Sequence, residues 1–175
     1  MQSPFCLGQS LQNPMHKKIQ DFLSKQYTLH LSVCASFQDS KLNKDCKSKK
    51  KCESSGDSSV QIPYTACCFY AFDASEYALI FKSDSETKHI IYAKNAPIVG
   101  VSIAYSSLKI THIKGAQIRA EFLSATQSQE ELYYKKFPFA KAHQGSLWQL
   151  RIVWLKYTDN TLFGAKKMEF VREKN

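Results

Sequence analysis

A chain of 175 residues, 43% of them hydrophobic, is long enough for one ordinary hydrophobic core and short for two. Its six cysteines include no Cys-x-x-Cys pair, which argues against a structural zinc site, and their spacing does not match a disulfide scaffold. The formal net charge is +9, but the segment 41–52, with six lysines and one aspartate, supplies five of these charges. This segment lies in a Ser-rich stretch, 38–59, without hydrophobic periodicity. We therefore interpret it as a solvated loop insertion and do not expect specific nucleic-acid binding.

We expect neither a secretory signal nor a membrane-spanning segment. Residues 1–18 lack a charged segment followed by an apolar run, the pattern of a signal peptide, and no apolar run approaches the ~20 residues that span a bilayer. We expect a soluble, reduced, cytoplasmic protein without a membrane partner. The expected organisation is a flexible tail at 1–14 and a single domain at 15–175.

The first predicted elements are a helix and a strand. Residues 15–26 carry apolar side chains at the spacing of one helical stripe. Residues 27–37 then alternate with period two, which predicts a half-buried strand with Leu29, Leu31 and Val33 on its buried face.

A hairpin and a second helix follow. Pro63 precedes an apolar strand at 64–72, and a short turn at 73–75 leads to another strand at 76–82. Residues 84–94 are predicted to be helical, with the helix stopping at Asn95-Ala96-Pro97.

Alternation returns in the strand predicted at 98–105. Its Gly100, Ser102 and Ala104 form a face of small side chains, which indicates close approach by a helix, another strand or a flat ligand. The next extended run is 109–124, where Gly115 predicts a β-bulge.

The last predicted elements are a helix at 128–136, ended by Pro138, and a strand at 147–158. This strand places Trp148, Leu150, Ile152 and Trp154 on one face, so core packing is expected for both tryptophans. Because most strands follow one another without intervening helices, we predict a mainly β fold, an antiparallel barrel with peripheral helices.

The turn at 83–89 has two interpretations. Ser83 and Glu86 are three residues apart, so they could form a capping box with Ser83 as the N-cap. Alternatively, the hydroxyls, the free N–H groups of the first helical turn and the charges of Lys82 and Lys88 could bind an anion such as a phosphate.

No catalytic motif stands out elsewhere. The five histidines are scattered without metal-ligand spacing, and neither a Gly-x-Ser-x-Gly elbow nor a Gly-x-x-x-x-Gly-Lys loop is present. We predict no metal site, and catalytic residues cannot be assigned.

The order of these elements resembles the FMN-binding split barrels related to pyridoxamine 5′-phosphate oxidase. More narrowly, residues 15–172 resemble the uncharacterised bacterial YhbP-like family, through five segments. These are "FYAFD" (69–73), "TKH" (87–89), "GAQIRAE" (115–121), "KKFPFA" (135–140) and "KYTDNTLFGAKKM" (156–168).

The resemblance implies a six-stranded antiparallel split β-barrel that forms a homodimer and holds FMN at the subunit interface. It assigns Lys82, Ser83, Thr87 and Lys88 to the FMN phosphate and implies an FMN-dependent oxidoreductase acting on a small substrate. The remaining implied cofactor contacts are Thr65, Ala66 and Cys67 along the flavin ring, with Gln117 and, from the partner subunit, Trp148.

Two other functions stay open. Some split-barrel relatives bind or degrade haem, which would require an axial ligand such as His30, His89, His112 or His143. The chain could also be a non-catalytic binding module that reaches an acidic partner through the lysine-rich loop.

Overall fold

The computed structural model describes residues 14–36, 61–105, 107–161 and 166–173. The loop insertion predicted at 38–59, and the predicted tail apart from Pro14, lie outside these residues.

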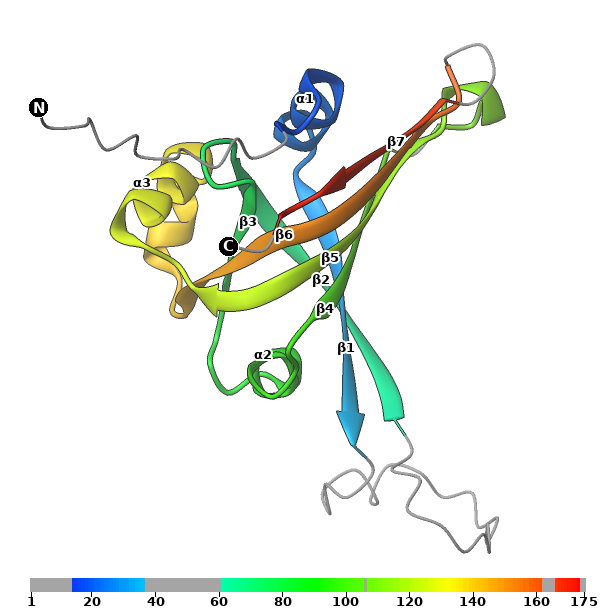
Figure 1. Ribbon diagram of the computed structural model, residues 1–175. Coiled ribbons are helices and arrows are strands. Elements are labelled where there is room, and N and C mark those ends of the chain that lie inside the picture. Colours follow the sequence, from blue (N-terminus) through cyan, green and yellow to red (C-terminus); the bar gives the residue numbers. More distant parts are fainter. Residues whose placement is uncertain (1–13, 37–60, 106, 162–165, 174–175) are drawn as a thin grey trace, which may run out of the picture.

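Six antiparallel strands form a closed barrel, as predicted (Figure 1). Going around the barrel, the order is β3-β2-β1-β4-β5-β6, and β6 pairs again with β3 to close the ring. A seventh strand, β7, pairs with the free side of β6 and was not predicted. The strands span β1 Thr28–Ser36, β2 Gln61–Asp73, β3 Ala78–Ser83, β4 Val99–Tyr105, β5 Lys114–Ser124, β6 Ser146–Asp159 and β7 Lys166–Val171.

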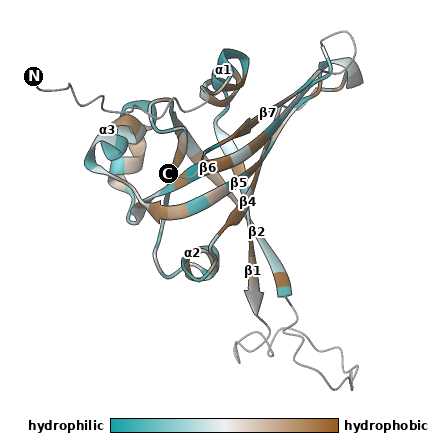
Figure 2. Ribbon diagram, viewed as in Figure 1, coloured by the Kyte–Doolittle hydropathy of each residue, from teal (hydrophilic) through white to brown (hydrophobic). Residues whose placement is uncertain are grey.

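Three α-helices pack on the outside of this barrel. Helices α1 and α2 lie on opposite sides of it, and α3 lies beside β2 and β3 (Figure 1). Figure 2 shows hydrophilic residues on these helices and hydrophobic residues along much of the strands. The helices are α1 Lys17–Lys25, α2 Lys88–Lys94 and α3 Gln127–Lys136, with 3-10 turns η2 Ile110–His112 and η3 Pro138–Ala142.

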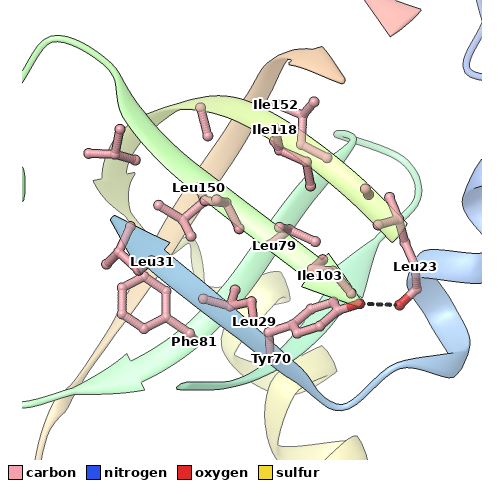
Figure 3. Packing of buried hydrophobic residues seen from close by; sticks show 14 of the residues in the cluster. Leu23, Leu29, Leu31, Tyr70, Leu79, Phe81, Ile103, Ile118, Leu150 and Ile152 are labelled. Atoms are coloured by element: carbon pink, nitrogen blue, oxygen red, sulfur yellow. Dashed lines mark hydrogen bonds between the residues drawn. The ribbon is translucent and has the colours of Figure 1, made fainter. Parts of the chain in front are cut away.

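Large aliphatic and aromatic side chains fill the barrel interior. They come from every strand of the ring, as the alternation of the sequence predicts, and many are fully buried (Figure 3). The Tyr70 hydroxyl donates a 2.6 Å hydrogen bond to the carbonyl of Leu23, which fastens α1 to the barrel. The residues labelled in Figure 3 are Leu23, Leu29, Leu31, Tyr70, Leu79, Phe81, Ile103, Ile118, Leu150 and Ile152.

A β-bulge occurs in β6 rather than at Gly115. Arg119 pairs with Trp154 but Ala120 pairs with Ile152, so Val153 is the extra residue. The bulge reverses the alternation of β6, and the expectation that Trp154 shares the inward face of Trp148 is wrong. Trp154 is half-buried, with the Arg119 guanidinium 5.2 Å from its ring centroid, and Leu155 takes the inward position.

Two further boundaries differ from the prediction. Residues 110–112 form η2 instead of extended strand, and β5 starts at Lys114. Helix α2 begins at Lys88, so Ser83 ends β3 and is not an N-cap. Thr87 occupies the N-cap position, because residues 84–87 form a separate turn closed by a hydrogen bond from the Thr87 N–H to the Asp84 carbonyl (3.2 Å).

Lys82 fastens the segment after α3 to the barrel. Its Nζ donates to the carbonyls of Ala140 (2.8 Å) and His143 (2.6 Å) and to the Tyr134 hydroxyl (3.2 Å). The same segment continues to Gly145, where φ is +120° and an added Cβ would lie 3.1 Å from the carbonyl carbon of Ser83. Residues 138–145 therefore support the end of β3.

Asp73 connects the β2–β3 turn to α3. One carboxylate oxygen accepts hydrogen bonds from the N–H and hydroxyl of Ser75 (3.0 and 2.6 Å) and from the N–H of Glu76 (3.3 Å). The other oxygen accepts from the Gln129 side-chain amide (3.0 Å). Burial disfavours the charge, but these hydrogen bonds outweigh burial and lower the pKa of Asp73 from its ordinary 3.8.

Replacing Asp73 by Ala is expected to lower the free energy of unfolding by about 2–3 kcal/mol at pH 7, since four donors lose a charged acceptor. Because the folded-state pKa is depressed, this stabilisation is present above the unfolded pKa and disappears as the pH falls through the folded pKa. Urea denaturation between pH 7 and pH 2 measures the difference. Asp84→Ala, which removes an exposed carboxylate accepting from the Glu86 N–H, is the control. A difference between wild type and Asp73→Ala that did not shrink in acid would contradict this role.

Replacing Lys82 by Met keeps the aliphatic stem but removes the three donated hydrogen bonds. We expect a loss of about 1.5–3 kcal/mol in stability and faster amide hydrogen exchange within residues 138–145. Lys135→Met, on the exposed side of α3, is the matched control. Unchanged exchange in residues 138–145 would show that Lys82 does not hold this segment.

Candidate functional site

Two hydroxyls and an imidazole meet where β3 ends. The turn at 84–87 folds back because the Thr87 hydroxyl also donates to the Asp84 carbonyl (2.8 Å). This brings the Ser83 Oγ within 3.3 Å of the Thr87 Oγ1. The Nε2 of His89 lies 2.8 Å from the Ser83 Oγ and 3.4 Å from the Thr87 Oγ1. We call Ser83, Thr87 and His89 the β3-end cluster.

His89 was not among the predicted cofactor contacts. Burial lowers the pKa of its half-buried ring, so the imidazole is neutral at pH 7. A neutral imidazole has one N–H donor and one acceptor nitrogen. His89 can therefore complete a hydrogen-bonded set with the two hydroxyls, or present an N–H to an incoming anion. Its place directly after Thr87 and Lys88 was the signal in the sequence.

Trp148 supports this cluster from β6. Its indole N–H donates to the Ser83 carbonyl (3.1 Å), and its ring stacks on Phe122 with centroids 5.0 Å apart. The Lys94 ammonium lies 5.0 Å from the ring centroid. Within one chain, the buried Trp148 thus fixes the backbone that carries Ser83.

The charges around the β3-end cluster are of both signs. Lys88 is exposed at the first position of α2, directly after Thr87. Asp84 and Glu86 are also exposed, and the Asp84 carboxylate accepts from the Glu86 N–H (2.9 Å). Lys82, predicted to bind the same anion, directs its ammonium toward Ala140 and His143.

Three of the four predicted contacts to the flavin ring, Thr65, Cys67 and Gln117, lie on the outer surface of the barrel. Cys67 of β2 pairs with His30 of β1, His30 with Ser102 of β4, and Ser102 with Gln117 of β5. Laterally paired residues point to the same face, so these four side chains form one exposed row. We call it the outer row.

Strand alternation separates the three residues predicted from β2. Thr65 is exposed on the same face as Cys67, and its hydroxyl lies 3.3 Å from that of Ser32. Ala66 points to the other face, where it packs against the main core. The predicted cofactor contacts thus fall into an outer group (Thr65, Cys67 and Gln117), a β3-end group (Ser83, Thr87, Lys88 and Trp148), Lys82 in its own network, and Ala66 against the core.

The adjacent cysteines differ in their surroundings, as their positions on opposite strand faces predict. Cys67 is exposed, whereas burial, with a smaller contribution from Cys67, raises the pKa of the Cys68 thiol to about 11. Cys68 is therefore a protonated core residue at neutral pH.

The arrangement favours binding of an anion at the β3-end cluster and of something flat against the small side chains of the outer surface. Among the residues that the structure describes, no group of three or more His, Cys, Asp or Glu side chains could hold a metal ion. Within those same ranges, no helix is long and apolar enough to cross a membrane.

Comparison with known sequences gives a family without an assigned function. No family model matches the chain. A UPF0306 protein of Campylobacter jejuni is 42% identical over 111 residues, which cover 63% of this chain and 82% of the relative.

Solved structures show the same fold at low sequence identity. A haem-binding protein of Mycobacterium smegmatis aligns with a TM-score of 0.58 and 10% identity, over 83% of this chain and 53% of that one. For an FAD-binding protein of Mesorhizobium loti the TM-score is 0.55 and the identity 12%, over 81% and 91% of the two chains. A candidate pyridoxamine 5′-phosphate oxidase of Listeria innocua aligns with a TM-score of 0.52 and 16% identity, over 81% of this chain and 95% of that one.

The predicted family and fold are therefore confirmed: the chain belongs to the uncharacterised UPF0306 family and has the split-barrel fold of the pyridoxamine 5′-phosphate oxidase-like superfamily.

Proposed function

We propose that this protein binds FMN and acts as a flavin-dependent oxidoreductase on a small substrate. The observation that carries the proposal is the β3-end cluster, in which an imidazole nitrogen lies within 3.4 Å of two hydroxyl oxygens. The comparisons support the proposal because similar solved structures include an FAD-binding protein and a candidate pyridoxamine 5′-phosphate oxidase.

The donors at the β3-end cluster suit the phosphate of FMN. A phosphate monoester presents acceptor oxygens and close to two negative charges. Ser83 can supply a hydroxyl donor, His89 an imidazole N–H, and Lys88 a point charge. The Thr87 hydroxyl, which donates to the Asp84 carbonyl, would have to turn toward the phosphate to donate to it. Asp84 and Glu86 are exposed, so water screens their repulsion of the phosphate.

The outer row and its neighbours offer a platform for the flavin ring. Gly100 pairs with Ser32, and an added Cβ on Gly100 would lie 3.6 Å from the Ser32 carbonyl oxygen. Such small side chains let a flat ring, or a second sheet, approach the backbone. Because the outer group and the β3-end group occupy different parts of the surface, we propose that a homodimer completes the site.

Bound flavin would supply the redox chemistry, accepting and passing on electrons or hydride. The protein's own groups would bind and orient it. Ser83, Thr87, His89 and Lys88 would hold the phosphate, and Trp148 would hold the Ser83 backbone through its indole N–H.

Haem binding is the second candidate, supported by the similarity to the haem-binding protein of Mycobacterium smegmatis. Among the four histidines considered as axial ligands, His30, His112 and His143 are exposed. His89 is half-buried, and its Nε2 is already within hydrogen-bonding distance of the Ser83 and Thr87 hydroxyls. His30, in the outer row, is the best placed for a flat macrocycle.

The absorption spectrum of the protein purified without added cofactor, with mass spectrometry of any released ligand, tests both candidates. We expect flavin bands and the mass of FMN, either directly or after reconstitution with FMN. A Soret band that shifts on titration with haemin would replace the proposal by the second candidate. A colourless protein that binds neither would overturn both.

Replacing Lys88 by Ala is expected to weaken FMN binding by about 10- to 100-fold, because a charge-assisted hydrogen bond to phosphate contributes about 1.5–3 kcal/mol. Quenching of FMN fluorescence on titration measures the affinity. Lys135→Ala on the exposed side of α3 is the matched control and should bind FMN as the wild type does. Riboflavin, which lacks the phosphate, should bind wild type and Lys88→Ala equally. Equal FMN affinity of the Lys88 variant and wild type would remove this phosphate assignment.

A further inference from the structure

We propose that the groove between α1 and the projecting ends of β5 and β6 binds a small aromatic anion, such as an arylcarboxylate. Its cavity has a volume of about 600 Å³, within the usual size range of small-molecule sites. It shares no residue with the β3-end cluster, and α1 and α2 lie on opposite sides of the barrel (Figure 1). The lining residues used in the argument are Lys18, Phe22, Lys25, Tyr105, His112 and Tyr157.

The floor of the groove is aromatic. Phe22 of α1 and Tyr157 of β6 are both buried, with ring centroids 5.0 Å apart and planes tilted by 48°. Tyr105 adds a third ring, and 48% of its surface is exposed although it follows Val101 and Ile103 on the inward face of β4. An aromatic side chain left open beside two buried rings favours a ligand with a flat apolar part.

One of the two carboxylates that line the groove, Asp159, is already paired with a cation. Asp159 is buried and accepts hydrogen bonds from the Tyr157 hydroxyl (3.1 Å) and from the N–H and hydroxyl of Thr161 (3.0 and 2.6 Å). Its carboxylate also forms an ion pair with Lys114 at 3.2 Å. Burial opposes ionisation, but these contacts outweigh burial and lower the pKa of Asp159. This aspartate therefore stays ionised and paired at neutral pH.

The remaining charges leave the rim positive. With Asp159 and Lys114 paired, Lys18 and Lys25 of α1 face Asp21 alone among the lining carboxylates, and His112 of η2 adds a polar donor. An anion at this rim would gain Coulomb attraction in partial contact with water, while its ring would rest on the aromatic floor. The positive rim beside the aromatic floor therefore favours ligands that have both an anionic group and a flat aromatic ring.

The test uses the full chain, labelled with ¹⁵N, and 2-naphthoate as the probe. Saturable shifts are expected at the backbone amides of Phe22, Lys25 and Tyr105. Naphthalene-2-carboxamide, which keeps the rings but lacks the charge, should bind at least about five-fold more weakly.

Three variants test which residues of the groove bind 2-naphthoate. Lys18→Gln and Lys25→Gln should each weaken 2-naphthoate binding by about three- to five-fold, and Tyr105→Ala by about ten-fold. Lys17→Gln removes an exposed lysine of α1 that does not line the groove, and should leave the affinity unchanged.

Three outcomes would overturn the proposal: unsaturated shifts, shifts centred on residues 83–89, or equal affinity for the carboxamide. Ligand binding in the groove and at the β3-end cluster would shift different backbone amides. The test of the groove therefore does not depend on whether the protein binds FMN.

Discussion

Closure of the sheet by the pairing of β3 with β6 is the constraint on which the rest of the structure depends. Without this pairing, β3 would leave an open edge beside α3, and the inward faces of β3 and β6 would not meet. Closure gives a small barrel whose interior side chains fill, as Phe81, Leu150 and Ile152 do here. A cofactor-sized ligand must therefore bind at an end of the barrel or on its outer surface.

The two helices on opposite sides of the barrel create different chemical settings. Helix α1 packs through Ile19, Phe22 and Leu23, and the ends of β5 and β6 project past it to form an aromatic groove with lysines at its rim. Helix α2 packs through Ile90, Tyr92 and Ala93, and its short entry turn gathers the β3-end cluster. One site thus lies beside α1 and the other at the start of α2.

Much of the barrel could be predicted because burial of one face imposes alternation, as in Leu29, Leu31 and Val33. The bulge at Val153 could not, since residues 152–155 are all apolar and fit either face. Strand β7 was not predicted because its sequence is mostly polar and lacks a clear alternation: Phe170 is buried, but its neighbour Val171 is an exposed hydrophobic residue. At the candidate site, the hydroxyl-rich turn was visible in the sequence. The direction of the Lys82 ammonium could not be predicted, because the carbonyls that it contacts are 58 and 61 residues later in the sequence.

The network of Lys82 also decides how an anion could be held at the end of β3. A lysine ammonium has three donors, and here it contacts three oxygen atoms, of Tyr134, Ala140 and His143. A phosphate could recruit this ammonium only by releasing one of them, which would leave a carbonyl or hydroxyl without its charged donor. An anion bound by Ser83, Thr87 and Lys88, which lie at the end of β3, in the turn and at the start of α2, would leave these Lys82 contacts intact. Lys82 is therefore better understood as a positioning residue that supports the backbone of the cluster than as a ligand of the anion.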